Sequence, residues 1–511
     1  MKGNLTSKKE DSLKKRYLYK LTANLIGLAI NLVTQSIIPR GLAPTAYGSF
    51  SFLSAFFTQI VGFFDAGTSI GFYTKLSQNL EDVGLIKIYN FFAVILSAFT
   101  ILVVAIILTT GFGDSLWPDQ EGIYIWMGLF WALLTWYSQI INKILDAYGI
   151  TSKSEIVRTQ QRFLGMILVL LMFVSNQFSL TNFFLYHYLI LFFLCFSWWN
   201  LLQKQGIELF PKVQQTAREI RQYIKDFYTY SSPLIIYSFV GLLVGLLDRW
   251  MLQKFAGSVQ QGFYGLSYQI GAICFLFTSA MTPLLTREFA KAFGETDLLK
   301  MRSLFQQYIP MLYAIAAYFG AFAFIQAKKI SLLVGGQDYT EASVAIGLMT
   351  LYPIHQTYGQ LSGAVFLATG QTKLYRNIGI LFMLLGLPMT ILLIAPKEWL
   401  GLNLGSTGLA IKMVIIQFFG VNLQLWFNTR FLSMSFWNLL RHQIYSLSLL
   451  LGIAWIAAFI VDMLIENTLL AFLTSGLIYS IGSILLLFLV PSVFGISRKQ
   501  LNGIINRPVK I

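Results

Sequence analysis

The feature that most constrains the fold is the grouping of apolar residues into about fourteen blocks of roughly 20 residues. A helix of about this length crosses the hydrocarbon core of a bilayer. Backbone amides in hydrocarbon must be bonded within their own segment, and the blocks lack the alternation of barrel strands, so each predicts a helix. Charged residues make up only 12% of the 511 residues. The sequence therefore predicts an all-α, polytopic membrane protein.

The predicted spans form two sets of six and a final pair. The fifth span is short, so we expect it to be tilted or partly re-entrant. A charged leader precedes the first span without a small-residue cleavage site, and we therefore expect a retained first helix. The spans cover residues 21–38, 47–72, 88–112, 123–144, 163–178 and 183–202, then 230–247, 261–285, 304–325, 342–369, 378–395 and 404–427, and finally 445–461 and 469–490.

The distribution of positive charge predicts the orientation. With the N-terminus in the cytoplasm, the inward segments carry 30 of the 37 Lys and Arg residues, and the outward loops carry six. Cationic loops resist translocation, so we expect both termini in the cytoplasm and the protein in the cell (cytoplasmic or inner) membrane. The formal net charge of +15 then reflects topology and contact with anionic lipids. Nucleic-acid binding would concentrate that charge on one soluble module.

One cytoplasmic connection predicts more than a turn. Between residues 211 and 228, apolar residues recur at helical spacing, and Lys and Arg occupy the other positions. This pattern is typical of a basic amphipathic helix that lies on the membrane surface. It falls between the sixth and seventh spans, where two halves of the chain would meet.

Two pairs of short motifs predict an internal duplication. Residues 47–50 (YGSF) and 261–264 (QGFY) each open a span, and residues 147–151 (AYGIT) and 368–372 (ATGQT) each follow one. The two pairs occur in the same order, and their members are separated by nearly the same length of chain. Six helices per repeat is an even number, so the halves are parallel repeats with the same orientation. Two such bundles can open a cleft alternately to each side of the membrane, as transporters do.

The duplication predicts four parts of the chain. They are a six-helix lobe (1–203), a cytoplasmic amphipathic linker (204–229), a second six-helix lobe (230–440), and two extra helices with a basic cytoplasmic tail (441–511).

Several short motifs follow one another in order along the chain. They are residues 40–48 (RGLAPTAYG), 64–67 (FDAG), 248–250 (DRW) and 262–264 (GFY), Pro283 with Arg287, and 366–373 (FLATGQTK). In order and spacing they resemble the polysaccharide flippase (Wzx-type) family. That family belongs to the multidrug, oligosaccharidyl-lipid and polysaccharide (MOP) exporter superfamily.

The resemblance implies a fold and a function. The fold is two six-helix lobes plus two extra helices. The function is movement of a polyprenyl-diphosphate-linked oligosaccharide from the inner to the outer leaflet, driven by an ion gradient or the membrane potential. The implied partners are that lipid-linked oligosaccharide, membrane lipids, and the polysaccharide polymerase and glycosyltransferases of the same pathway. No cofactor and no nucleic acid is implied.

A diphosphate that crosses the membrane needs fixed cations along its route. Lys412 lies well within a predicted span, about 12 Å from its outer end. Arg249 and Arg40 precede equivalent spans in the two halves. We predict that these three residues bind substrate. The alternatives are snorkelling for Lys412, an ion pair with Asp248 for Arg249, and capping of a helix end for Arg40.

Asp65 is the only acid predicted well inside a span, and it is the candidate for ion coupling. Its alternative is a hydrogen-bonded structural acid. His355 follows Pro353, which predicts a kink, and a lone histidine favours structural hydrogen bonding. We assign His355, Asp248 and Arg287 structural or accessory roles.

Two other functions compete with the flippase. A cation-coupled multidrug exporter of the same superfamily would favour several acids at membrane depth. An integral-membrane glycosyltransferase or polymerase would need a sizeable loop with catalytic side chains, and the predicted loops are short. Cys195 and Cys274 lie inside spans without metal-ligand spacing, and no phosphate-binding Gly-rich loop followed by Lys and Ser or Thr occurs. We therefore expect no enzyme activity, no metal and no ATP use.

Overall fold

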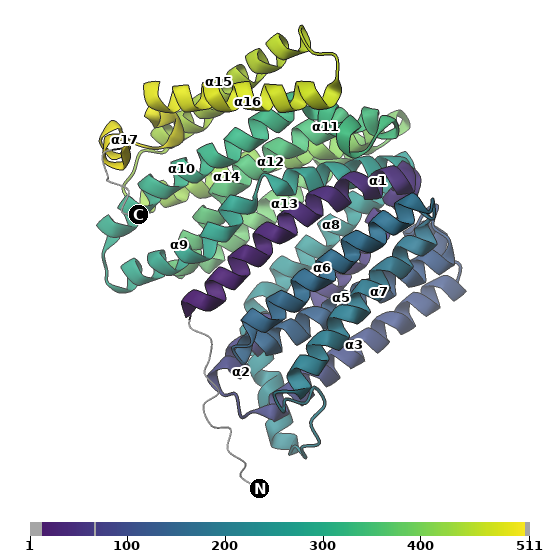
Figure 1. The fold of residues 1–511 in the computed structure, drawn as a ribbon. Coiled ribbons are helices and arrows are strands. Elements are labelled where there is room, and N and C mark those ends of the chain that lie inside the picture. The colour runs from purple at the N-terminus through teal and green to yellow at the C-terminus, as the bar shows by residue number, and fades with distance from the viewer. Residues whose placement is uncertain (1–12, 66–67, 506–511) are drawn as a thin grey trace. The chain divides into compact units, whose positions relative to one another are not determined.

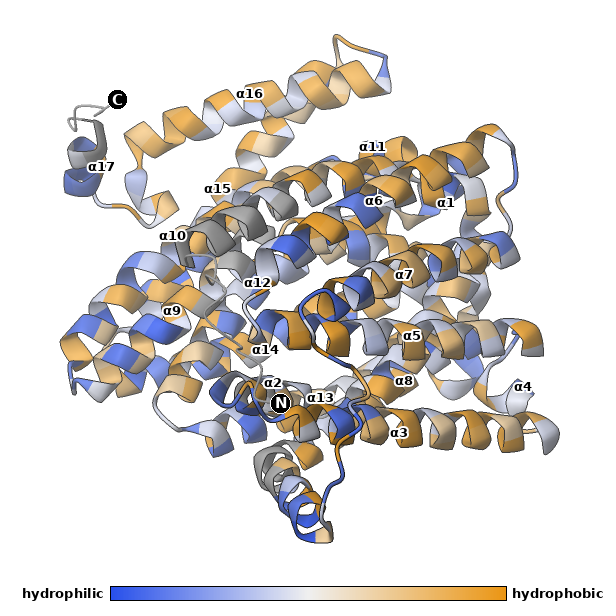
Figure 2. Cartoon of the chain, turned by 60° about the horizontal axis from the view of Figure 1, so that its bottom comes forward, coloured by the Kyte–Doolittle hydropathy of each residue, from blue (hydrophilic) through white to orange (hydrophobic). Residues whose placement is uncertain are grey.

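The computed structural model describes residues 13–65 and 68–505, and regular structure throughout that part is helical. The charged leader before residue 13, Ala66 and Gly67 of the FDAG motif, and the last six residues lie outside it. Ten of the described helices are long and apolar enough to cross a membrane. Figure 2 shows that hydrophobic residues dominate the long helices. The chain is therefore a multi-pass membrane protein, while the total of fourteen spans remains a prediction.

Internal contacts divide the chain into two compact units, Met1–Ser258 (unit 1) and Val259–Ile511 (unit 2). The four-part division expected from the sequence remains a prediction. Unit 1 contains α1 (Leu13–Asp65), α2 (Thr68–Gln78), α3 (Val83–Thr109), α4 (Gly113–Leu116), α5 (Gly122–Ala147), α6 (Thr151–Val174), α7 (Leu180–Gln203) and the first part of α8 (Ala217–Ile273). Unit 2 contains the rest of α8, then α9 (Leu276–Gly294), α10 (Leu298–Ile325), α11 (Ala327–Val334), η1 (Gln337–Ala342), α12 (Ser343–Ala368), α13 (Thr372–Ile394), η2 (Lys397–Trp399), α14 (Gly405–Phe431), α15 (Phe436–Asp462), α16 (Thr468–Leu489), η3 (Pro491–Phe494) and α17 (Arg498–Ile505).

Helix α5 lies at the centre of unit 1. It packs against α1 and α7, and α6 packs against both of these helices (Figure 1). Large buried side chains fill the space between α1 and the α4 region, including Phe52, Phe57 and Trp117. Unit 1 is therefore held together mainly by the packing of apolar side chains.

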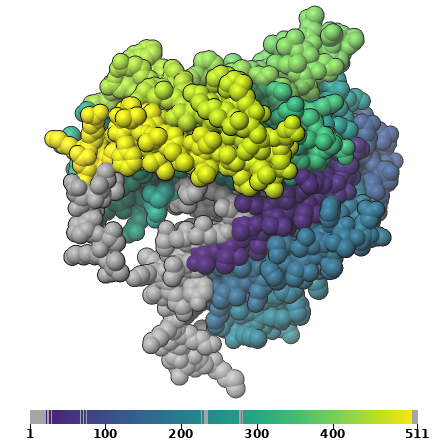
Figure 3. Space-filling model, turned by 45° about the horizontal axis from the view of Figure 1, so that its top comes forward, coloured from purple at the N-terminus to yellow at the C-terminus, as the bar shows by residue number. Residues whose placement is uncertain are grey.

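Helix α12 has the same central place in unit 2, between α10 and α14. Seventeen of its 26 residues are buried. The C-terminal helices α15 and α16 pack on the outside of this bundle, where the Tyr479 ring stacks on Tyr318 at 4.9 Å. At one end, Lys329 of α11 forms an ion pair with Asp462 of α15 at 2.5 Å. Figure 3 shows these last helices, yellow-green to yellow, on the visible face of the unit.

The order of helices repeats along the chain, as the motif pairs predicted. The first residues of α5 and α12 are separated by the same length of chain as those of α6 and α13, and those of α3 and α10 by nearly the same length. The second motif pair has a physical cause. Gly149 and Gly370 both have a φ of +72°, and the next residue in each case donates its N–H to a carbonyl five residues back, at 2.9 and 2.8 Å. This is the Schellman end of a helix, which favours glycine.

The first motif pair marks a second shared feature, a sharp turn inside α1 and inside α8. Ala43 has φ 57° and ψ 166°, and Gly257 has φ 77° and ψ −179°. The two turns are separated by the same length of chain as Gly48 and Gly262 of the motifs that follow them. A straight helix of 53 residues would be about 80 Å long, more than twice the hydrocarbon thickness. The turns therefore divide each long helix into two shorter arms.

Two sequence-based boundaries are corrected. The short span predicted at 163–178 lies mostly in α6, which ends at Val174, has 24 residues and is long enough to cross without re-entry. The amphipathic helix expected from residue 211 begins at Ala217 and continues into the span that follows it. Its start is fixed by a capping box, in which Glu219 accepts hydrogen bonds from the backbone and hydroxyl of Thr216 at 2.8 and 3.0 Å. These bonds hold the pKa of the Glu219 carboxyl below its usual value.

The two turns predict opposite effects of opposite substitutions. The backbone conformation of Ala43 is one that only glycine adopts freely, and it costs about 1–3 kcal/mol for other residues. We expect Ala43→Gly to leave stability unchanged or raise it, because relief of strain offsets the chain entropy of glycine. We expect Gly257→Ala to lower stability by about 1–2 kcal/mol, since an added Cβ there meets no atom within 4 Å and only backbone strain acts.

The measurement is thermal unfolding of the purified protein in detergent. The control is Ala105→Gly, in the regular part of α3, which should cost about 1 kcal/mol. A loss for Ala43→Gly as large as that of the control would contradict the strained turn.

Candidate functional site

Asp65 is held by a group of hydroxyl residues in unit 1. Helix α1 ends at Asp65 and α2 begins at Thr68. One carboxylate oxygen accepts from the Ser69 backbone N–H and from the Tyr89 hydroxyl, both at 3.2 Å. The other oxygen accepts from the Ser69 hydroxyl at 2.9 Å. Asp65 therefore caps α2, where the helix dipole favours an anion. The carboxylate has the hydrogen bonds that a structural role requires.

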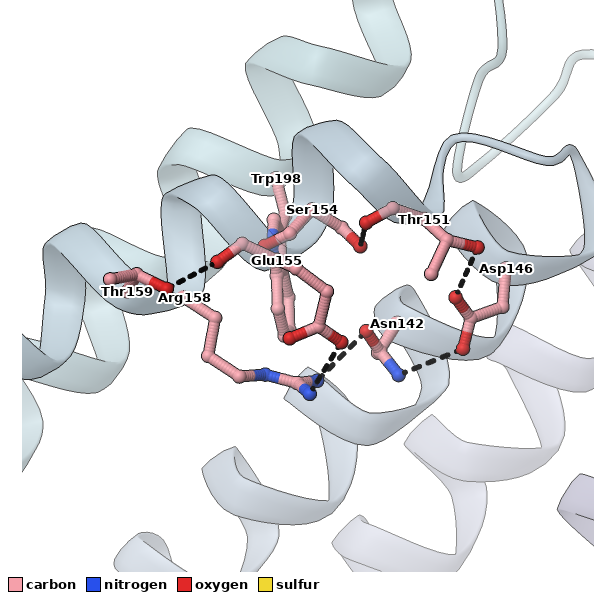
Figure 4. Close-up of polar contacts among 8 residues, drawn as sticks. All are labelled: Asn142, Asp146, Thr151, Ser154, Glu155, Arg158, Thr159 and Trp198. Carbon is pink, nitrogen blue, oxygen red and sulfur yellow. Dashed lines mark hydrogen bonds and ion pairs between the residues drawn. The ribbon is translucent and has the colours of Figure 1, made fainter. Parts of the chain in front are cut away.

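A second polar group, which the sequence analysis missed, joins α5, α6 and α7 in unit 1. Arg158 pairs with Glu155 at 3.0 Å, donates to the side-chain oxygen of Asn142 at 2.9 Å, and lies 5.3 Å from the centre of the Trp198 ring (Figure 4). The Trp198 indole N–H donates to the Ser154 carbonyl at 3.2 Å. These contacts fasten the first turns of α6 to both neighbouring helices.

The Asp146 carboxylate continues this network into the turn between α5 and α6. It accepts from the Thr151 hydroxyl at 2.9 Å and from the Asn142 amide at 3.4 Å (Figure 4). The Glu155 side chain is only 3% exposed, and its second oxygen has no hydrogen-bond partner among the described residues. Unit 1 thus holds a second acid, more buried than Asp65. The predicted fifth span begins at residue 163, so the sequence pattern places Glu155 and Arg158 in the preceding loop.

The predicted cations Arg40 and Arg249 both belong to unit 1. Arg40 is exposed on α1, three residues before the turn at Ala43. Arg249 is half-buried on α8 and acts electrostatically on Tyr47, which follows the same turn. Asp248 beside it is buried. The structure thus brings Arg249 close to the turn that Arg40 precedes, and a substrate role for either arginine remains a prediction.

Lys412 belongs to unit 2 and is only 4% exposed, on α14. A Cβ added to Gly386 of α13 would lie 2.8 Å from Cε and 3.3 Å from Nζ of this lysine. The side chain therefore lies against the α13 backbone and does not extend to the surface as snorkelling would require. Gly386 makes room for it. Substrate contact by Lys412 remains a prediction.

His355 and Arg287 occupy different environments in unit 2. His355 is buried in α12, with its ring 5.1 Å from that of Phe418, and its Nδ1 has no hydrogen-bond partner in the described part of the chain. That nitrogen therefore lacks the expected hydrogen bond to the described residues, and the imidazole ring packs against aromatic rings. Arg287 is exposed on α9. No group of three or more metal-ligating side chains occurs among the described residues.

The ion pair in unit 1 predicts an asymmetry between its two partners. Arg158→Met leaves the buried Glu155 carboxylate without its counter-charge, and we expect it to destabilise the protein by about 3 kcal/mol. Glu155→Gln keeps the shape and removes the charge, so we expect a smaller loss. The double variant should recover part of the stability lost in Arg158→Met. Thermal unfolding of the three variants checks this order, and equal losses for both single variants would contradict it.

The comparisons with known proteins concern the fold. No family model and no curated protein matches the sequence. Among solved structures, the chain is similar to the lipid II flippase MurJ in an inward closed conformation, with a TM-score of 0.62, 14% identity, and coverage of 92% of this chain and 98% of that one. It is also similar to a multidrug resistance MATE family transporter of the MOP superfamily. The inward-facing form gives a TM-score of 0.56, 14% identity, and coverage of 82% and 98%. The outward-facing form gives 0.55, 15%, and coverage of 82% and 96%. The chain therefore has the two-lobed, all-helical fold of MOP superfamily transporters.

Proposed function

We propose that the chain is a flippase that moves a polyprenyl-diphosphate-linked oligosaccharide from the inner to the outer leaflet by alternating access. The observation that carries this proposal is the similarity to the lipid II flippase over 92% of the chain. The ordered motifs of the sequence add the resemblance to polysaccharide flippases. Together they favour a lipid with a diphosphate and a sugar headgroup as the cargo.

A cation-coupled multidrug exporter is the second candidate, supported by the similarity to both forms of the MATE transporter. Those matches cover 82% of this chain, compared with 92% for the flippase. The flippase match therefore accounts for more of a chain that carries the additional helices α15 and α16. For this reason we favour the lipid-linked cargo.

The direct test of this function is to remove the protein from its cells and to locate lipid-linked glycans. We expect polyprenyl-diphosphate-linked glycan to accumulate in the inner leaflet, where a glycosidase added outside spheroplasts cannot reach it. Normal exposure of the glycan, together with raised sensitivity to cationic drugs, would favour the exporter.

Coupling to an ion gradient is assigned to Asp65. Its carboxylate is surrounded by the hydroxyls of Ser69 and Tyr89, which can rearrange around a bound cation or proton. One charge that crosses the membrane potential gains about 2.3 kcal/mol per 100 mV, which is enough to bias a transport cycle.

We expect Asp65→Asn to slow flipping about tenfold and to abolish its response to an imposed ion gradient in proteoliposomes. Ser69→Ala is the matched control, because it removes only the hydroxyl bond to the carboxylate and keeps both the backbone bond and the charge. It should lower the unfolding temperature and preserve the gradient response. If Asp65→Asn responds to the gradient as the wild type does, the carboxylate is only a helix cap.

The diphosphate is assigned to Lys412 and Arg249, with Arg40 nearer the surface. Lys412→Met keeps the length of the side chain against Gly386 and removes its charge. We expect Lys412→Met and Arg249→Met each to slow flipping of a diphosphate-linked glycan about tenfold. Lys328→Ala, which changes an exposed lysine of α11, should flip at the wild-type rate. An unchanged rate for Lys412→Met would make this lysine a packing residue.

A further inference from the structure

Helix α12 of unit 2 presents a single polar stripe. Between Ala345 and Phe366, all side chains are buried except five, namely Leu348, Leu351, Tyr352, Gln356 and Gln360. Tyr352, Gln356 and Gln360 are spaced four residues apart, so they lie along one face of the helix. We call these three residues the α12 stripe.

The α12 stripe lies at the middle of α12, which covers nearly all of the span predicted at residues 342–369. Gln356 is the fourteenth of the 26 residues of α12, about 20 Å from either end. Gln417 is the thirteenth of the 27 residues of α14 and so lies at the middle of its own helix. Its side-chain amide donates to the side-chain oxygen of Gln356. An amide with unused hydrogen-bonding groups is costly in hydrocarbon, so this accessible face borders water or a polar ligand rather than lipid.

The stripe has hydrogen-bonding groups that the protein leaves unused. Gln360 accepts from the Thr282 hydroxyl at 2.8 Å, and Gln356 accepts from Gln417. Neither bond uses the N–H₂ group of the stripe residue, and no described residue accepts from those donors. On α14, about two helical turns after Gln417, the Gln424 carbonyl oxygen is buried and has no partner among the described residues. Bonds that only joined helices would not leave such groups open.

The chemistry of the stripe is that of carbohydrate recognition. Neutral amides donate to and accept from sugar hydroxyls, and a tyrosine ring offers an apolar face with a polar tip. The α12 stripe contains no charged residue. We propose that the α12 stripe binds the sugar headgroup of the cargo and contributes selectivity for an uncharged glycan, separately from the cations assigned to the diphosphate. This inference rests on the proposed function.

Binding of two lipids to the full chain in nanodiscs tests it. The first probe is a polyprenyl diphosphate that carries a neutral disaccharide, and the second is the same polyprenyl diphosphate without sugar. We expect the wild type to bind the glycosylated lipid about tenfold more tightly. Gln356→Ala and Gln360→Ala should each weaken binding of that lipid about fivefold, the value of one lost hydrogen bond, and leave the bare lipid unaffected. Gln337→Ala, on the exposed turn η1, is the matched control and should change neither.

A second measurement covers the case in which an alanine variant folds poorly. In Gln356→Cys, a water-soluble maleimide should react at position 356, and the glycosylated lipid should slow this reaction more than the bare lipid does. The parent chain, which contains Cys195 and Cys274, gives the background.

The outcomes separate the inference from the function on which it rests. Equal weakening of both lipids by the alanine variants, or no reaction of the introduced thiol in folded Gln356→Cys, would make the α12 stripe structural and overturn the inference. Equal wild-type affinity for both lipids would overturn the inference and leave a diphosphate-lipid flippase. Failure of the wild type to bind either lipid would overturn the proposed function and the inference together.

Discussion

The structure depends on the requirement that every backbone polar group within a bilayer find a partner inside the protein. The requirement makes the chain helical, and it also decides what happens where a helix is interrupted. Asp65 caps α2 directly after α1 ends, and Ser69 and Tyr89 complete its bonds. The Schellman turns at Gly149 and Gly370 close helix ends in the same way in both halves. Interruptions of the helices are thus one kind of place where polar groups are held in unit 1 and unit 2.

The two units carry different polar groups. Unit 1 holds charged groups, in the cap formed by Asp65 and in the ion pair of Glu155 with Arg158. The middle of α12 in unit 2 instead carries uncharged amides, with Lys412 as a buried cation on the neighbouring helix α14. A cargo with a diphosphate and a sugar needs both kinds of contact, and a driving ion needs a carboxylate. The proposed flippase function assigns each of these tasks to a different group.

The sequence predicts the helical class and the duplication well, because both leave short-range signals. Apolar runs define the spans, and the glycines of the repeated motifs are required by a positive φ at Gly149 and Gly370. The polar network at Glu155 was missed because the charged residues in the first turns of α6 come before its apolar run, and that run defines the predicted span. The start of α8 could have been read from the capping box at Thr216 and Glu219. The contact of Lys412 with Gly386 could not have been read from the sequence, because it depends on how α13 and α14 pack together. Neither segment alone has a sequence pattern that predicts this packing.

The central claim is that the chain moves a sugar headgroup across a bilayer, and one measurement tests it most directly. The purified wild-type protein is reconstituted into liposomes that contain a polyprenyl-diphosphate-linked glycan in both leaflets, and an impermeant glycosidase is added outside. Without protein, the enzyme should digest only the outer half of the glycan and then stop. With the protein, the account predicts that digestion continues to near completion within minutes and accelerates when an ion gradient is imposed. Digestion that stops at one half in intact, protein-containing vesicles would contradict it.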